Sequence, residues 1–395
     1  MSGRARWVRA AGALCAALLV GTSCSAPAPQ DSATAAVEDL LERRAAAVLD
    51  RDEAAYAATG RPDDEFDHLA QVPLGSWEYR LTRLDRTRAG ATATAALAYR
   101  IEGHDRAPVT VRRTLDLTHR DGRWQVAAER PAPDAGEQLW EQGAVTAVRG
   151  ERSLVLGVGQ GERRLRRYAA LADRAVPAVQ SAWGRGWPGR VVVLVPDSTQ
   201  DMAGLLGAAA SAYQGIAAVT TGEAGGDGQA PADRVIVNPE SYDLLGDLGK
   251  QVVLTHETTH VATRAHTSDA TPLWLSEGFA DWVGYRGTGR TPEQAAPELH
   301  RAVRAGRAPE RLPDDEAFGF AGDAGRLARA YESGWLACRM IAERHGEAAL
   351  VDFYRKVGAH PRRAGAVAGA LQDVFGLTPE AFTREWRDYV RRALG

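Results

Sequence analysis

Residues 254–260 read Leu-Thr-His-Glu-Thr-Thr-His and restrict the fold of this chain more than any other segment does. They lie in a stretch, residues 244–264, whose apolar spacing is helical, and four residues advance an α-helix by about 400°. His256 and His260 therefore project from one face of a helix, one turn apart. Two imidazoles at that spacing can bind one Zn²⁺ ion, and Glu257 stands beside the first of them. The segment predicts a helix that carries two metal ligands.

A second acidic stretch completes this pattern. Sixteen residues separate His260 from Glu277, which lies in residues 271–282, Thr-Pro-Leu-Trp-Leu-Ser-Glu-Gly-Phe-Ala-Asp-Trp. The threonine can cap a helix and the proline can open it. We expect Glu277 to be the third protein ligand, which leaves one position open for water. Asp281 is one turn further along the same face, where it can accept the outer N–H of a ligating histidine.

Together these two stretches resemble the gluzincin zinc peptidases, which include aminopeptidase-N-like and thermolysin-like enzymes. The pair His-Glu-x-x-His and Trp-Leu-x-Glu-Gly-Phe-Ala is most similar to the bacterial peptidase-MA-like group, over about residues 150–395. The resemblance implies a zincin fold and hydrolysis of peptide bonds with one zinc ion. The residues to which it assigns roles are the ligands His256, His260 and Glu277, the general base Glu257 and the supporting Asp281.

The chain departs from the aminopeptidase pattern in one respect. The Gly-Ala-Met-Glu-Asn strand of those enzymes is absent, and Gly215-Ile-Ala-Ala-Val219 is the candidate for the matching edge strand. Such a strand can offer its backbone to a peptide substrate. Without the glutamate of that motif nothing indicates recognition of a free amino terminus, so we expect an endopeptidase.

A metzincin-like arrangement is the alternative for the metal. His266 lies ten residues after His256, where a metzincin has its third histidine. Metzincins also need a glycine at the helix exit, where this chain has Thr263, and a later Met-turn, whereas Met340 lies in an apparent helix. Glu277 is therefore the preferred third ligand.

An electrophile should stabilise the oxyanion that forms during peptide hydrolysis. Tyr331 is the candidate because related enzymes carry a tyrosine on a helix that follows the glutamate ligand. His345 and Tyr285 are the alternatives.

The amino terminus has the features of an export signal. Basic residues precede an apolar stretch, Ala10–Val20, that is too short to span a bilayer comfortably. Small residues then lead to Cys24, as in a bacterial lipobox, although Gly21 stands where leucine is usual. We expect residues 1–24 to be a lipoprotein signal peptide and Cys24 to become the lipidated amino terminus. This predicts a protein anchored to the outer side of the cell membrane, with an ordinary cleaved signal and secretion as the alternative.

The remaining sequence predicts an α+β protein with two domains. After a tether at 25–34, residues 35–130 combine a helix from about Thr34 to Ala58 with alternating strands, and resemble the nuclear-transport-factor-like cone fold. A Pro- and Gly-containing linker is expected at 131–143. Residues 144–395 then form the zincin domain, which ends in a helical subdomain.

Composition limits the range of partners. Formal net charge is -3 and no basic stripe is evident, which argues against nucleic acid. Cys338, the one cysteine beyond the lipobox, lies in an apolar helical run and is expected to be buried and inert. The sequence predicts a monomer that acts on peptides or proteins.

Two other functions are alternatives to a peptidase. One is an inactive zincin that serves as a scaffold, and the intact Glu257 argues against it. The other is a ligand-binding lipoprotein with a structural metal.

Overall fold

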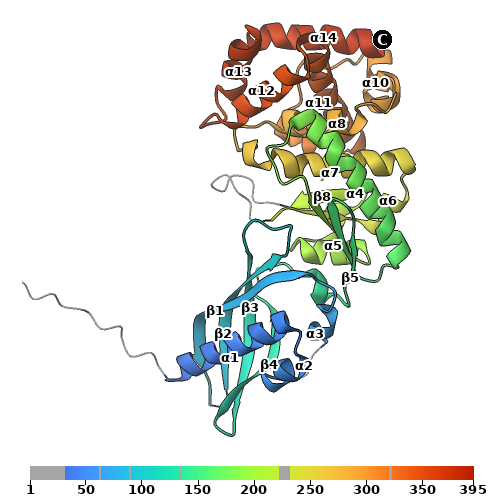
Figure 1. The fold of residues 1–395 in the computed structure, drawn as a ribbon. Coiled ribbons are helices and arrows are strands. Elements are labelled where there is room, and N and C mark those ends of the chain that lie inside the picture. Colours follow the sequence, from blue (N-terminus) through green and yellow to red (C-terminus); the bar gives the residue numbers. More distant parts are fainter. Residues whose placement is uncertain (1–31, 62–63, 89, 134, 222–231, 320–322) are drawn as a thin grey trace, which may run out of the picture.

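A computed structural model describes residues 32–61, 64–88, 90–133, 135–221, 232–319 and 323–395 (Figure 1). A four-stranded sheet and a five-stranded sheet are combined with many helices, so the expected α+β class is confirmed. The signal peptide, Cys24 and most of the tether lie outside the described residues. Within those residues, no helix is both long enough and apolar enough to cross a membrane.

The N-terminal unit packs one long helix on an antiparallel sheet (Figure 1). The strands follow each other in the order β1-β2-β3-β4, as successive hairpins. Helix α1 turns Val37, Leu40 and Leu41 toward this sheet, and each is at most 1% exposed. The elements are α1 (Ser32–Asp50), α2 (Glu53–Ala58), α3 (Glu65–His68), β1 (Leu74–Arg86), β2 (Gly90–Ile101), β3 (Val109–Arg120) and β4 (Arg123–Pro131).

The prediction of a single helix from Thr34 to Ala58 is wrong in one respect, because the structure has two helices there, α1 and α2. Arg51 adopts a left-handed backbone conformation with φ 58°, which ends α1. The Asp52 side chain then accepts a hydrogen bond from the Ala55 amide and starts α2. Apolar spacing continues through the break, and this is why the spacing alone did not reveal it.

A buried ion-pair cluster lies inside the N-terminal unit. Arg44 is fully buried and its Nε lies 3.1 Å from Glu129 Oε2. Arg113 contacts the other oxygen of Glu129 at 3.1 Å and reaches Glu141 at 2.6 Å. Burial and the charge of Glu129 raise the pKa of the neighbouring Glu65 to about 8. The cluster therefore balances two guanidinium groups best when one of its three carboxyls keeps a proton.

The second sheet has the order β5-β6-β7-β9-β8. Strands β6, β7 and β9 are parallel, while β5 and β8 pair antiparallel at the two edges. Helix α4 buries a continuous apolar face beside the sheet, with Leu165, Ala172, Val176 and Val179 fully buried. The elements are β5 (Thr146–Arg149), β6 (Ser153–Gly157), α4 (Glu162–Trp183), β7 (Val191–Val195), α5 (Thr199–Leu205), β8 (Ala218–Thr221) and β9 (Arg234–Val237).

Helices make up the rest of the chain and surround the predicted metal-binding segments. Helix α8 packs between α7 and α11, and the later helices form the carboxyl-terminal end of the molecule (Figure 1). Cys338 is fully buried in α11. The elements are α6 (Pro239–Asp243), α7 (Asp247–Thr263), α8 (Leu273–Tyr285), α9 (Pro292–Ala295), α10 (Pro297–Arg304), α11 (Ala324–His345), α12 (Glu347–Gly358), α13 (Ala366–Phe375) and α14 (Pro379–Leu394), with short 3₁₀ turns at Leu139–Glu141, Ala210–Tyr213, Arg264–His266 and Asp315–Phe318.

The segment expected as a linker, 131–143, instead helps to join the two parts of the protein. Its 3₁₀ turn buries Trp140, whose ring lies 5.4 Å from Trp77 and 5.0 Å from Tyr99. This aromatic group belongs to one apolar cluster with Leu154 and Leu156 of β6. The sheet of the second unit thus shares a core with the N-terminal unit, and the tryptophan supplies apolar area that a loose linker would lack.

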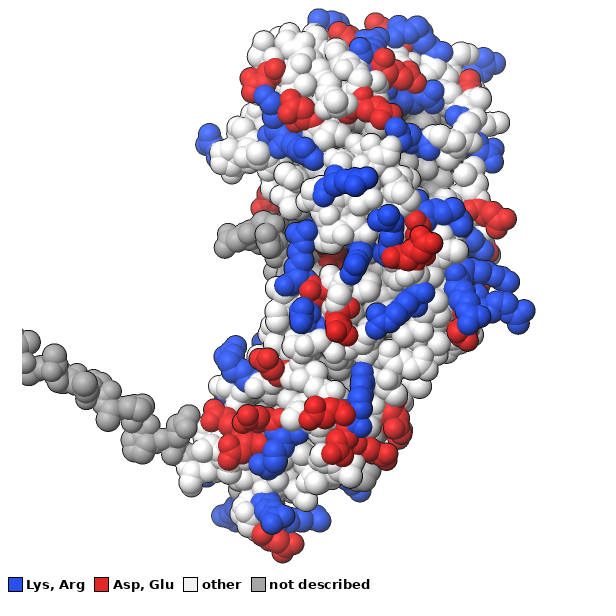
Figure 2. Space-filling view, in the orientation of Figure 1, with Lys and Arg blue, Asp and Glu red and all other residues white. Residues whose placement is uncertain are grey.

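Charged side chains are unevenly distributed on the surface. On the face in Figure 2, acidic side chains gather over the N-terminal unit and basic ones over the central part of the molecule. Helix α4 contributes a run of arginines, Arg163, Arg164, Arg166 and Arg167, of which all but Arg164 are exposed. The N-terminal unit therefore presents a larger share of acidic side chains on this face than the central part of the molecule does.

Candidate metal centre

Helix α7 presents the two histidines of the metal-binding motif. It begins at Asp247, buries Val252, Leu254 and Ala262, and packs against both α4 and α8. Helix α8 begins at Leu273, one residue later than predicted, because Pro272 and not Thr271 is its N-cap residue; it carries Glu277 in its second turn. His256, His260 and Glu277 are each only partly exposed, with side-chain exposure between 12% and 19%.

The three predicted ligands converge on one point. His256 Nε2 and His260 Nε2 are 3.0 Å apart. Glu277 Oε2 lies 3.2 Å from the first nitrogen and 3.4 Å from the second. Within the described residues, this is the group of three histidine, cysteine or acidic side chains whose ligand atoms lie close enough together to hold a metal ion.

This triangle fits a zinc ion. Two donors that are about 2.0–2.1 Å from a tetrahedral zinc ion lie about 3.3 Å from each other. Asp281 Oδ1 is 2.8 Å from His256 Nδ1, so the proton of the neutral imidazole belongs on Nδ1 and the lone pair of Nε2 faces the other two donors. Two imidazole nitrogens and a carboxylate oxygen form a donor set typical of zinc.

The electrostatics of these side chains also favour a cation between them. Burial lowers the pKa of His256, but Asp281 and hydrogen bonds to Asp281 and Glu277 outweigh it, and the net pKa is raised well above the usual value. Burial raises the pKa of Glu277, yet the two histidines overcome this and hold it far below its ordinary range. The site therefore stabilises positive charge at its centre.

Glu257 points its carboxylate toward the edge strand β8, and this contact was not predicted. Thr220 in β8 donates from Oγ1 to Glu257 Oε2 at 2.6 Å, and the same hydroxyl lies 3.1 Å from the Glu257 carbonyl oxygen. Glu257 itself is 7% exposed. The edge strand expected at Gly215–Val219 forms slightly later, as Ala218–Thr221, because Gly215 has φ 79° and turns the chain before the strand begins.

Tyr331 lies near this site because helices α8 and α11 cross closely. A Cβ on Gly278 would lie 2.3 Å from the Gly334 carbonyl carbon, so α8 and α11 meet with no side chain between them. Tyr331 is one turn before Gly334, and its ring centre lies 6.3 Å from that of His256. Burial, with the negative charge of Glu277 next, raises its pKa well above the usual value, which keeps the hydroxyl protonated and able to donate.

The residues considered as alternatives for the third ligand and for the oxyanion-stabilising group pack against aromatic rings. His266 packs edge-on against Trp183 at 5.5 Å, and burial together with Arg355 lowers its pKa. It does not join the three converging ligands. The ring of His345 lies against Phe375 at 4.5 Å, and that of Tyr285 lies 5.6 Å from Trp335.

Comparisons with known proteins add little to this picture. No protein-family profile and no curated protein matches the chain. Structures with some similarity include a variant of a two-domain M1 zinc metallopeptidase bound to L-arginine, at 14% identity and a TM-score of 0.37. A variant of the Deinococcus radiodurans M1 zinc metallopeptidase with a Tyr-Ser-Ala substrate matches at 15% identity and a TM-score of 0.35. Both matches cover 76% of this chain and 61% of the other, so this chain spans about three fifths of their length. Similarity this low carries no weight for the function, which is inferred from the site itself.

Proposed function

We propose that this chain is a zinc-dependent peptidase that cleaves peptide bonds within polypeptides. The observation that supports this most is the convergence of three donor atoms within 3.0–3.4 Å of one another. Glu257, which is not a ligand, lies beside them. The Asp281 carboxylate accepts a hydrogen bond from Nδ1 of His256, the ring nitrogen that faces away from the other ligands. A purely structural zinc site would use four protein ligands and would not need the glutamate.

Each residue of the site has a specific role in the proposed reaction. His256, His260 and Glu277 would hold a zinc ion, which would supply Lewis acidity to polarise the substrate carbonyl and lower the pKa of water. Glu257 accepts the proton of the attacking water and can pass it to the leaving amine. Thr220 orients the Glu257 carboxylate through its 2.6 Å hydrogen bond. Tyr331 donates a hydrogen bond from its hydroxyl to the carbonyl oxygen as that oxygen gains negative charge.

Strand β8 supplies the surface along which a peptide can lie. It is the last strand of its sheet and pairs with β9 on one side. An extended peptide can add to such an edge through main-chain hydrogen bonds, which places the bond to be cleaved near Glu257, the partner of Thr220. Because this binding mode does not depend on a free terminus, it suits an endopeptidase.

The proposal includes the cellular location. Lipidation at Cys24 would anchor the chain to the outer side of the cell membrane, with the catalytic unit beyond the N-terminal domain. Its substrates would then be peptides or proteins outside the cytoplasm.

Purified protein from residue 25 onward provides the test. It should contain one zinc ion per chain, digest casein, lose this activity with a chelator and regain it when zinc is added back. Glu257→Gln should keep the zinc and lose several orders of magnitude in turnover, because the water is no longer deprotonated. If the folded, zinc-loaded protein digests neither casein nor a mixed peptide library, the proposal is wrong.

A further inference from the structure

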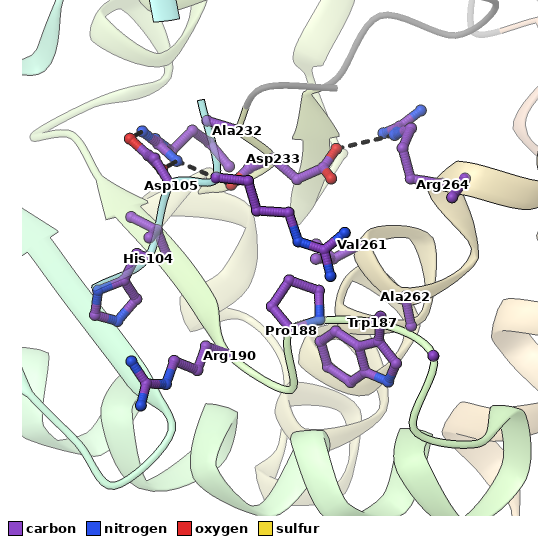
Figure 3. Close-up of a pocket in the computed structure, with 15 residues that line it drawn as sticks. His104, Asp105, Trp187, Pro188, Arg190, Ala232, Asp233, Val261, Ala262 and Arg264 are labelled. Atoms are coloured by element: carbon purple, nitrogen blue, oxygen red, sulfur yellow. Dashed lines mark hydrogen bonds and ion pairs between the residues drawn. The ribbon is translucent and has the colours of Figure 1, made fainter. Parts of the chain in front are cut away.

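A charged cavity of about 70 Å³ lies where the N-terminal unit meets α7 (Figure 3). One wall is the turn after β2, which carries His104 and Asp105, and another is the loop that contains Trp187 and Arg190. The start of β9 and the end of α7 close it. A water molecule occupies about 10–15 Å³ by this kind of measure, so the cavity has room for a small polar group and a few waters.

The charges of the cavity are unbalanced. Four arginines and two aspartates line it. Each aspartate already has a partner: Arg234 contacts Asp105 with both terminal nitrogens at 2.7 Å, and Arg264 contacts Asp233 at 2.9 Å. Among the described residues that line the cavity, no carboxylate remains to offset the other two arginines, Arg106 and Arg190.

The two remaining arginines lie on opposite sides of the domain junction. Arg106 belongs to the N-terminal unit, and Arg190 precedes β7 in the second unit. Arg190 Nη1 donates to the Gly103 carbonyl at 2.7 Å, so this exposed side chain links the two units beside the cavity. Burial lowers the pKa of His104, and the charge of Arg190 contributes further, in keeping with a positive potential there.

The cavity adjoins the metal centre through two separate elements. Arg264 follows His260 by four residues and so lies one helical turn beyond it. Arg234 in β9 pairs with Thr221 in β8, and Thr221 directly follows Thr220, which hydrogen-bonds Glu257. The cavity therefore lies close to the metal centre, where β9 begins beside the end of β8.

We propose that this cavity is a specificity subsite that binds a carboxylate of the peptide substrate, through Arg106 and Arg190. Arginine suits this role because its N–H groups match the geometry of a carboxylate. The carboxylate can be an Asp or Glu side chain or the carboxyl terminus of the peptide. This inference rests on the proposed peptidase function, and it adds a preference for acidic substrates that the metal site alone does not give.

The test compares matched fluorogenic peptides. One series has an amidated carboxyl terminus and carries a single Glu or Gln at successive positions; a second compares free with amidated termini of a neutral peptide. Wild-type protein should favour one acidic member over its neutral partner by about tenfold in kcat/KM, in line with hydrogen bonds to a charged group. The series in which the preference occurs identifies the source of the carboxylate.

Variants connect this preference to the cavity. The double variant Arg106→Gln with Arg190→Gln should bring the ratio close to one, while Arg384→Gln, a matched change in α14, should keep the wild-type ratio. Circular dichroism and a melting curve establish that each variant is folded. A wild-type ratio near one at every position, or a ratio that survives in the double variant, would overturn the proposed subsite.

A binding measurement separates this inference from the proposed function. Labelled peptides are titrated against Glu257→Gln by fluorescence anisotropy, and the acidic member should bind about tenfold more tightly. The same difference should disappear when the two arginine changes are added. If the wild-type protein cleaves nothing but the acidic peptide still binds more tightly, the peptidase proposal fails and the subsite stands. If the protein cleaves peptides but binds the acidic and neutral members equally, the subsite fails and the peptidase proposal stands.

Discussion

The hydrogen bond between His256 and Asp281 allows a quantitative prediction. The two atoms are 2.8 Å apart, and the side chains are only 12% and 17% exposed, so water cannot easily replace the carboxylate. Asp281→Ala would free the imidazole to rotate and to carry its proton on either nitrogen. Loss of such an outer partner typically costs 10–100-fold in metal affinity or activity, about 1.4–2.7 kcal/mol. Because this partner is largely buried, we expect about 30–100-fold weaker zinc binding.

Competition with a chromophoric chelator measures this change in zinc affinity. Asp281→Asn is the matched control: it keeps an oxygen acceptor but no charge, so its loss should be smaller than that of Asp281→Ala. At saturating zinc, much of the peptidase rate of both variants should return. A dissociation constant for Asp281→Ala within twofold of wild type would refute the reasoning that Asp281 orients a metal ligand.

Four further results are expected. Thr220→Val should keep its zinc but lose about tenfold in kcat, with Thr220→Ser restoring the rate, because the hydrogen bond acts on a charged group. Gly334→Ala should destabilise the fold by about 1–3 kcal/mol in denaturant titrations, since its Cβ would lie 2.6 Å from a backbone oxygen, whereas Gly369→Ala has open space and should not. Burial raises the pKa of Glu65 to about 8 from 4.5, so stability is lost as pH rises between these values, and Glu65→Gln should raise the melting temperature more at pH 8 than at pH 5. Cys24→Ser should release the protein from the membrane fraction or leave its precursor unprocessed, and an unchanged partition would contradict lipidation.

Elements governed by local periodicity could be predicted from the sequence. The amphipathic pattern and the glycine that follows it define α4, and a proline defines the start of α8. The spacing of the two histidines determines their common face on α7. Their approach to Glu277 could be expected because the two helices follow each other closely in the chain.

Contacts between distant segments could not be predicted in this way. Thr220 is 37 residues from Glu257, and no local pattern indicates that β8 would pass beside it. The Asp105–Arg234 pair spans 129 residues and depends on how two domains dock. The Gly278–Gly334 crossing offers a weak signal, since two glycines within helices imply close backbone approach, but neither glycine identifies the other as its partner.

Zinc content of two single variants tests the central claim most directly. Glu277→Ala removes one of the three converging donors, whereas His266→Ala removes a histidine that packs on Trp183. Both proteins are checked for folding by circular dichroism, dialysed against a fixed low concentration of free zinc and analysed for bound metal. We predict that His266→Ala retains about one zinc ion per chain and that Glu277→Ala loses most of it. Retention of zinc by Glu277→Ala, with its loss from His266→Ala, would contradict the assignment and favour a metzincin-like site.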